Sequence, residues 1–260
     1  PDRVRRKERD ECFPRFFAKP YAIAKQCKAV DKYLIHNNIP ARAYTRRTEL
    51  LLDWDQQALD KQPLVYIDFS NQADSLRLQR EVTKSAPQAV IVNIAQESNV
   101  EPGVTHVGKQ KIYTYKDDQL EAIAQTIQEK GTGSKIVLLM SDKIHVNSDD
   151  WYKSLIGWVA IKEVAAASGR LVNKYDRIVE SGGIISANNE YIPLFKDRPK
   201  YFQGYIGNAE WVRNLSIIAP LFAAVSLDDL SAYFKDKKTA KRITFDDFCI
   251  WATKTKKKRL

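Results

Sequence analysis

The chain has 260 residues, of which 44% are hydrophobic and 28% are charged, and its formal net charge is +10. This globular composition excludes a disordered or collagen-like chain, and the excess of Lys and Arg favours a polyanionic partner. No stretch approaches the roughly 18 apolar residues of a membrane span. The three cysteines form no Cys-x-x-Cys pair, which argues against a secreted disulfide scaffold and a thiolate zinc site. We therefore expect an intracellular protein, cytoplasmic or nuclear, that contacts no membrane.

Residues 1–61 predict an N-terminal helical extension. Apolar side chains recur at helical spacing from Tyr21 to Asn37. Residues 45–60 predict a second helix, with Leu50, Leu51 and Trp54 on its inner face.

Residues 62–195 predict an α/β domain. Apolar, β-rich runs at 64–67, 89–94, 111–115 and 135–140 alternate with helical patterns at 73–85 and 117–130. Continuous apolar strands that alternate with helices are typical of a parallel sheet covered on both faces. In such sheets the ligand lies outside the carboxyl ends of the strands, so the site residues are expected there.

The rest of the chain is predicted to be mostly helical. A long helix is expected from Trp151 to Ala167, a strand or two between Leu171 and Tyr191, and further helix between Ala209 and Phe234. Residues 196–260 are thus expected to form a basic, helical C-terminal region.

Polar side chains follow the predicted strands where each one ends. They are Asp68 and Asn71 after the first strand, Asp117 and Asp118 after the third, Asp142 after the fourth, and Asp149 and Asp150 before the next helix. Parallel strands would bring these groups to one edge, where like charges repel unless a divalent cation neutralises them. Oxygen ligands suit Mg²⁺ or Mn²⁺, and such a site serves phosphodiester hydrolysis. The alternative for the aspartates outside the strand ends is that they only cap helices.

Three segments together resemble the PIN-like ribonuclease domain of the NYN, regnase-like type. They are YIDFSN (Tyr66–Asn71), HVGKQKIYTYKDD (His106–Asp118) and KIVLLMSD (Lys135–Asp142), and their order and spacing both fit. The resemblance covers about residues 63–150. It implies a PIN-like (Rossmannoid) sheet sandwiched by helices, and a metal-dependent endoribonuclease that cleaves single-stranded RNA with a metal-activated water.

The resemblance also implies roles for individual residues. Asp68, Asp117, Asp118 and Asp142 would hold Mg²⁺ or Mn²⁺, and Asn71 would orient Asp68. The regnase-like pattern has another acid at the position of Val146, which leaves Asp149 or Asp150 as a substitute ligand.

Two alternatives to an active ribonuclease remain open. If no acid replaces the missing one, the chain is a catalytically inactive PIN-like component that binds RNA in a nucleoprotein particle. A methyltransferase-like Rossmann domain is the third reading, and it lacks the glycine-rich loop that should follow the first strand.

Two basic segments close to aromatic residues predict contacts with RNA. The protein is expected to act as a homo-oligomer or within a nucleoprotein complex. Their positive charges suit phosphates, and the neighbouring Tyr233, Phe234 and Trp251 suit base stacking. The alternative is a solvated face or a nuclear-import patch. The predicted RNA-binding residues are Lys235, Lys237, Lys238, Lys241, Arg242, Lys254, Lys256, Lys257, Lys258 and Arg259.

Overall fold

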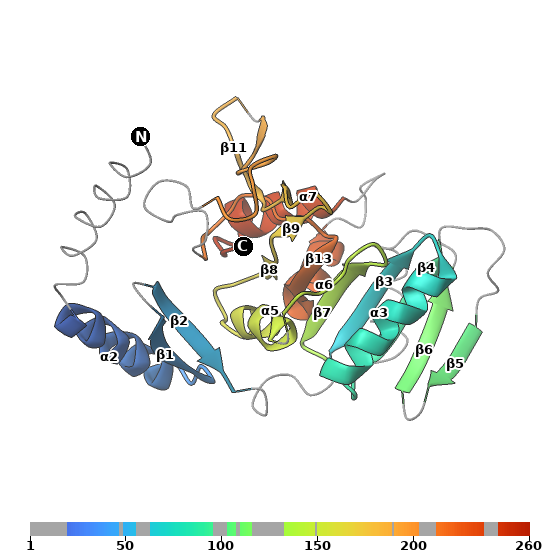
Figure 1. The fold of residues 1–260 in the computed structure, drawn as a ribbon, viewed down its shortest axis with the longest axis horizontal. Coiled ribbons are helices and arrows are strands. Elements are labelled where there is room, and N and C mark those ends of the chain that lie inside the picture. The colour runs from blue at the N-terminus through green and yellow to red at the C-terminus, as the bar shows by residue number, and fades with distance from the viewer. Residues whose placement is uncertain are drawn as a thin grey trace, which may run out of the picture. The chain divides into compact units, whose positions relative to one another are not determined.

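The chain forms two compact units, Pro1–Gln56 and Gln57–Leu260, which are described separately (Figure 1). The computed structural model describes residues 20–46, 49–55, 63–95, 103–107, 110–115, 133–148, 150–188, 190–202, 212–236 and 244–260. Within these ranges, no helix has both the length and the apolar character needed to cross a membrane.

The described residues of the first unit form a helix and a β-hairpin. Helix α2 (Pro20–His36) confirms the first predicted helix, but the second predicted helix is wrong. Strands β1 (Ala41–Arg46) and β2 (Glu49–Trp54) pair antiparallel there instead. Pairing with β1 gives the backbone of β2 its partners across the hairpin, which the spacing of its leucines does not reveal. The carboxylate of Asp31 on α2 accepts a hydrogen bond from the Ala43 amide at 2.6 Å.

The second unit is built on a seven-stranded mixed sheet with the order β5-β6-β4-β3-β7-β13-β8. Its strands are β3 (Leu64–Phe69), β4 (Val90–Ala95), β5 (Gly103–Val107), β6 (Gln110–Tyr115), β7 (Ile136–Ser141), β8 (Ala166–Ser168) and β13 (Phe222–Ser226). Strands β6, β4, β3 and β7 are mutually parallel, as predicted. The sheet as a whole is not parallel, because β5 and β13 run antiparallel to their neighbours.

Helices lie on both faces of this sheet. Helix α3 (Gln72–Ser85) crosses one face at β3 and β4, as Figure 1 shows, and buries Leu78 and Val82. Helices α6 (Leu227–Asp236) and α7 (Phe245–Ile250) and the π-helical turn η2 (Trp251–Thr255) pack on the other. The predicted helix 117–130 lies outside the described residues.

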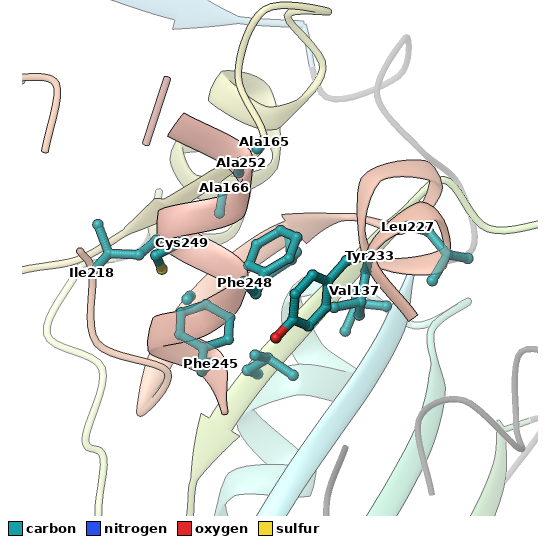
Figure 2. Packing of buried hydrophobic residues seen from close by; sticks show 14 of the residues in the cluster. Val137, Ala165, Ala166, Ile218, Leu227, Tyr233, Phe245, Phe248, Cys249 and Ala252 are labelled. Carbon is teal, nitrogen blue, oxygen red and sulfur yellow. The ribbon is translucent and has the colours of Figure 1, made fainter. Parts of the chain in front are cut away.

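The main core joins the second face of the sheet to these elements (Figure 2). Tyr66 and Val137 on the sheet belong to one cluster with Tyr233 of α6 and Phe248 of α7. The ring centroids of Tyr233 and Phe248 are 5.6 Å apart in an edge-to-face arrangement. Burying each such side chain stabilises the fold by about 1.5–3 kcal/mol.

Two predicted helices are shorter than expected, because strands occupy part of their sequence. Helix α5 (Trp151–Val159) ends well before Ala167, and β8 follows it. Strand β13 occupies the middle of the predicted helix 209–234. The predicted boundary at residue 195 therefore falls inside one unit, and residues 196–260 are not a separate helical region.

Two small antiparallel hairpins lie between β8 and β13 in the chain. Strands were expected in this range, but there are more than the one or two predicted: β9 (Leu171–Val172), β10 (Ile178–Glu180), β11 (Gly183–Ile185) and β12 (Tyr191–Pro193). The amide of Gly169, directly after β8, donates to the carbonyl of Phe222 at the start of β13. The chain therefore enters the hairpins at the edge of the sheet where β7 has its carboxyl end.

Candidate functional site

The chain changes direction in the sheet at the carboxyl ends of β3 and β7. From β3 it adds β4 and then β6 on one side, and it returns to place β7 on the other side of β3. Ligands of open α/β sheets bind at such a switch point. Asp68 lies opposite Ser141 in the strand register, and the Asp142 amide donates to the Asp68 carbonyl at 3.0 Å. The structure thus brings together Asp68 and Asp142, as predicted.

Asp142 fixes the loop that joins β3 to α3. Its side chain is buried, with 2% of the residue exposed, and its Oδ2 accepts hydrogen bonds from the amides of Ser70 at 2.9 Å and Asn71 at 3.0 Å. Hydrogen bonds to a charged acceptor are stronger than those between neutral groups. The carboxylate therefore fixes the β3–α3 loop relative to the end of β7 at the switch point.

Asn71 caps α3 in this structure. Its side-chain oxygen accepts a hydrogen bond from the Ala73 amide at 2.8 Å, and its backbone is extended, as expected of an N-cap residue. The implied role of Asn71 in orienting Asp68 stays a prediction.

Arg77 on α3 ties the helix to the loop that follows β7. Its Nη2 donates to the carbonyls of Asp142 at 2.6 Å and Ile144 at 2.9 Å, and its Nη1 contacts the Glu81 carboxylate at 3.0 Å. The loop after β7 is thus held by an arginine that no motif in the sequence singles out.

The predicted metal site is only partly visible. Asp117, Asp118 and Asp149 lie outside the described residues. Asp150 is exposed and forms a 3.2 Å ion pair with Lys153, the arrangement of a surface residue at the start of α5. In the part of the chain that the structure describes, no three His, Cys, Asp or Glu side chains gather as a metal site.

A second group of titratable side chains joins the hairpins to α7, and the sequence did not predict it. The Tyr191 hydroxyl donates to Glu180 Oε1 at 3.0 Å, and the same oxygen accepts from the Gly182 amide at 2.9 Å. Burial and then the Glu180 charge raise the pKa of Tyr191. Burial, Asp247 and Glu180 raise the pKa of Asp246. The only sequence signal is the acidic pair that follows Thr244, which also fits a helix cap.

Cys249 lies beside this group and is not a candidate nucleophile. Burial raises the pKa of its thiol to about 12, so the reactive thiolate is scarce near neutral pH.

Asp246→Asn is expected to stabilise the protein at neutral pH. An aspartate whose folded-state pKa lies above its unfolded value, about 4, favours folding less and less as pH rises through that range. The melting temperature of the variant should therefore exceed that of the wild type at pH 7 and match it near pH 3. Asp228→Asn, in the first turn of α6, is the matched control. A variant that melts lower than the wild type at pH 7 would show that ionised Asp246 supports the fold.

The predicted aromatic part of the basic segments is wrong. Tyr233 and Trp251 are 1% and 6% exposed and belong to the core, so their rings cannot stack on bases. Phe234 is half-buried and packs against the same core. Two of the basic side chains make contacts within the fold. Lys258 pairs with Asp229 at 2.6 Å, and Lys256 lies over the Trp251 ring. The exposed cations are Lys235, Lys254, Lys256, Lys257 and Arg259. The others predicted to bind RNA, which lie outside the described residues, are Lys237, Lys238, Lys241 and Arg242.

Comparison with known proteins assigns the chain neither a family nor a function. No family model matches the chain, and no curated protein matches it. One similar solved structure is 4-diphosphocytidyl-2C-methyl-D-erythritol synthase from Anaerococcus prevotii, at 12% identity and a TM-score of 0.40. The alignment covers 76% of this chain and 84% of that one. A similarity of this size carries no conclusion about the fold or the function of this chain. The chain is an α/β protein with a mixed central sheet flanked by helices.

Proposed function

We propose that the chain binds a nucleotide at the switch point between β3 and β7. The observation that carries this proposal is the fixed geometry of that edge, where Asp142 accepts hydrogen bonds from both loop amides. A site that is already ordered loses less entropy when a ligand binds. The strand order β6-β4-β3-β7 also supports it, because it matches the first four parallel strands of a dinucleotide-binding sheet, with the switch point between β3 and β7.

The side chains around this loop suit a nucleotide. Asp68 is half-buried at the end of β3, where a carboxylate can accept hydrogen bonds from ribose hydroxyls. Lys143 follows Asp142 and is exposed, where it supplies a positive charge for a phosphate. The net charge of +10 acts in the same direction, since it attracts anionic ligands.

Nucleoside diphosphates are expected to stabilise the protein by mass action, by about 2.7 kcal/mol at a concentration one hundred times Kd. Titration calorimetry and thermal melts with ADP, GDP, CDP and UDP measure this. Lys143→Gln should weaken binding, whereas Lys84→Gln, an exposed lysine in the last turn of α3, should not. The proposal fails if none of the four nucleotides binds, or if both lysine variants bind like the wild type.

A metal-dependent endoribonuclease is the second candidate, and a specific contact favours it. The hydrogen bond from the Asp142 amide to the Asp68 carbonyl brings two of the implied metal ligands to the ends of adjacent strands. Mg²⁺ or Mn²⁺ would be held by Asp68 and Asp142 together with Asp117 and Asp118. A bound metal of this kind supplies an activated water and stabilises charge on the phosphate. The PIN-like fold is part of this candidate.

Cleavage of labelled single-stranded RNA by metal-free protein, with Mn²⁺ added or with EDTA, tests this second candidate. We expect cleavage only with the metal, and a loss of at least about a hundredfold in Asp68→Asn, because the charge that holds the metal is removed. Asp150→Asn is the control, since its carboxylate is paired with Lys153. RNA binding without cleavage under any divalent metal would instead indicate a catalytically inactive component that binds RNA in a nucleoprotein particle.

A further inference from the structure

Two loops of the hairpin region form a single surface, composed of residues 173–177 and 195–202 and called here the Tyr175–Tyr201 surface. The Lys200 amide donates to the Asp176 carbonyl at 2.7 Å. The Ile178 amide donates to the Arg198 carbonyl at 2.7 Å, and the Asp197 amide donates back to the Ile178 carbonyl at 2.8 Å. Tyr175 precedes Asp176 and Tyr201 follows Lys200, so the two tyrosines are carried by backbone segments that are joined.

Hydrogen bonds within each loop keep the surface in shape. Asn173 Oδ1 accepts from the amides of both Tyr175 and Arg177 at 3.0 Å, which closes the first loop as a tight turn. The Arg177 guanidinium donates to the Asp197 carbonyl at 3.0 Å, which links the first loop to the second. Because the loops are already ordered, a ligand would not have to organise them.

The surface exposes aromatic rings beside positive charges. Tyr175 and Tyr201 are 73% and 74% exposed, although large rings usually bury much of their area. Lys174 lies 5.0 Å from the Tyr175 ring centroid, and Lys200 pairs with Asp176 at 3.0 Å on the surface. Basic residues outnumber acidic ones: Lys174, Arg177, Lys196, Arg198 and Lys200 against Asp176 and Asp197.

Behind the tyrosines, the second loop is supported by stacked side chains. The Phe195 and Phe202 ring centroids are 5.9 Å apart. The guanidinium of Arg198 lies 5.4 Å from the Phe202 ring centroid, and that of Arg213 lies 4.6 Å from the Phe195 centroid. These contacts leave the guanidinium groups near the surface while fixing the loop that carries Tyr201.

From this arrangement we propose that the Tyr175–Tyr201 surface binds single-stranded RNA, with bases stacked on the two tyrosines and phosphates on the neighbouring basic side chains. Exposed aromatic rings within a basic groove or surface are the means by which proteins bind single strands with little sequence preference. The basic segments of α6 and η2 do not offer this combination, because the aromatic rings closest to them are in the core. The Tyr175–Tyr201 surface offers both parts.

The test measures the affinity of the full chain for a fluorescein-labelled oligouridylate of about twenty nucleotides by fluorescence anisotropy at several salt concentrations. Tyr175→Ala combined with Tyr201→Ala is expected to weaken binding roughly tenfold or more. The corresponding double phenylalanine variant should bind like the wild type, because the ring is what stacks. Lys174→Gln combined with Lys200→Gln should flatten the slope of log affinity against log salt by about 0.7 per lost contact. Tyr33→Ala, a 53% exposed tyrosine on α2, is the matched control.

Three outcomes would overturn the proposal. The first is an alanine double variant that binds RNA like the wild type, and the second is an equal loss in Tyr33→Ala. The third is binding of the wild type to phosphatidylserine vesicles but not to the oligouridylate, which would make the surface a membrane contact. Thermal melts of each variant should match the wild type, since the replaced side chains are exposed. None of these outcomes bears on the nucleotide site at β3 and β7, which is tested with nucleoside diphosphates.

Discussion

Asp142→Ala is expected to lower the free energy of unfolding by about 3 kcal/mol, because the amides of Ser70 and Asn71 lose a charged acceptor at a buried position. Each hydrogen bond to a charged group contributes about 1.5–3 kcal/mol, and a buried donor without a partner adds a desolvation penalty. Urea denaturation followed by circular dichroism measures the change. Binding of nucleoside diphosphates should be lost as well, because the loop that shapes the site is no longer held.

Asp150→Ala provides the matched control for this substitution. Its carboxylate is exposed and pairs with Lys153 on the surface, so the free energy of unfolding should change by less than about 0.5 kcal/mol. A change below about 1 kcal/mol in Asp142→Ala would mean that water or another group satisfies the two amides equally well. In that case Asp142 does not organise the switch point, and the nucleotide proposal loses the observation that carries it.

Deleting residues 254–260 is expected to destabilise the protein by more than about 3 kcal/mol, although the segment is rich in lysine. The deletion removes Lys258 and leaves the buried carboxylate of Asp229 without its lysine partner. It removes Leu260, which is 6% exposed, and the carbonyls of Arg259 and Leu260 that accept from Ala165 and Leu215. Thermal and urea denaturation of the truncated chain measure the loss.

A triple variant separates this structural role from the RNA contacts predicted for the same segment. Lys254→Gln, Lys256→Gln and Lys257→Gln change exposed side chains, so the fold should be retained. If the segment contacts phosphates, RNA affinity should fall and the salt slope should flatten by about 0.7 per contact. A truncated chain as stable as the wild type would show that the contacts of Lys258 and Leu260 contribute little.

The central strands could be predicted from the sequence because their signal is local. The apolar runs of β3, β4 and β7 are buried on both faces, and such runs are uniform along the strand. The meeting of Asp68 and Asp142 follows from two parallel strands that end at the same edge.

The errors arose where pairing or packing with another segment decides the structure. Residues 166–168 follow a helix and are rich in alanine, which favours helix, but they form β8 by pairing with β13. Residues 49–54 form a strand because β1 pairs with them. Tyr233 and Trp251 have the same neighbours in sequence whether they face solvent or the core, so their burial could not be read from composition. Tyr175 and Tyr201 form one surface only after the loops that carry them are joined by hydrogen bonds such as that from the Lys200 amide to the Asp176 carbonyl.

The position of β13 has a consequence for how the chain folds as it is made. Since β13 pairs with β7 on one side and β8 on the other, both strands remain open edges until residues 222–226 have left the ribosome. Unpaired edges of apolar strands are templates for association with other chains. Closing contacts between such distant segments is also slow, because the entropy of the long intervening loop is lost first. The nascent chain therefore passes through a stage in which β7 and β8 are not yet joined by β13. Its solubility during synthesis depends on how quickly β13 pairs with both strands.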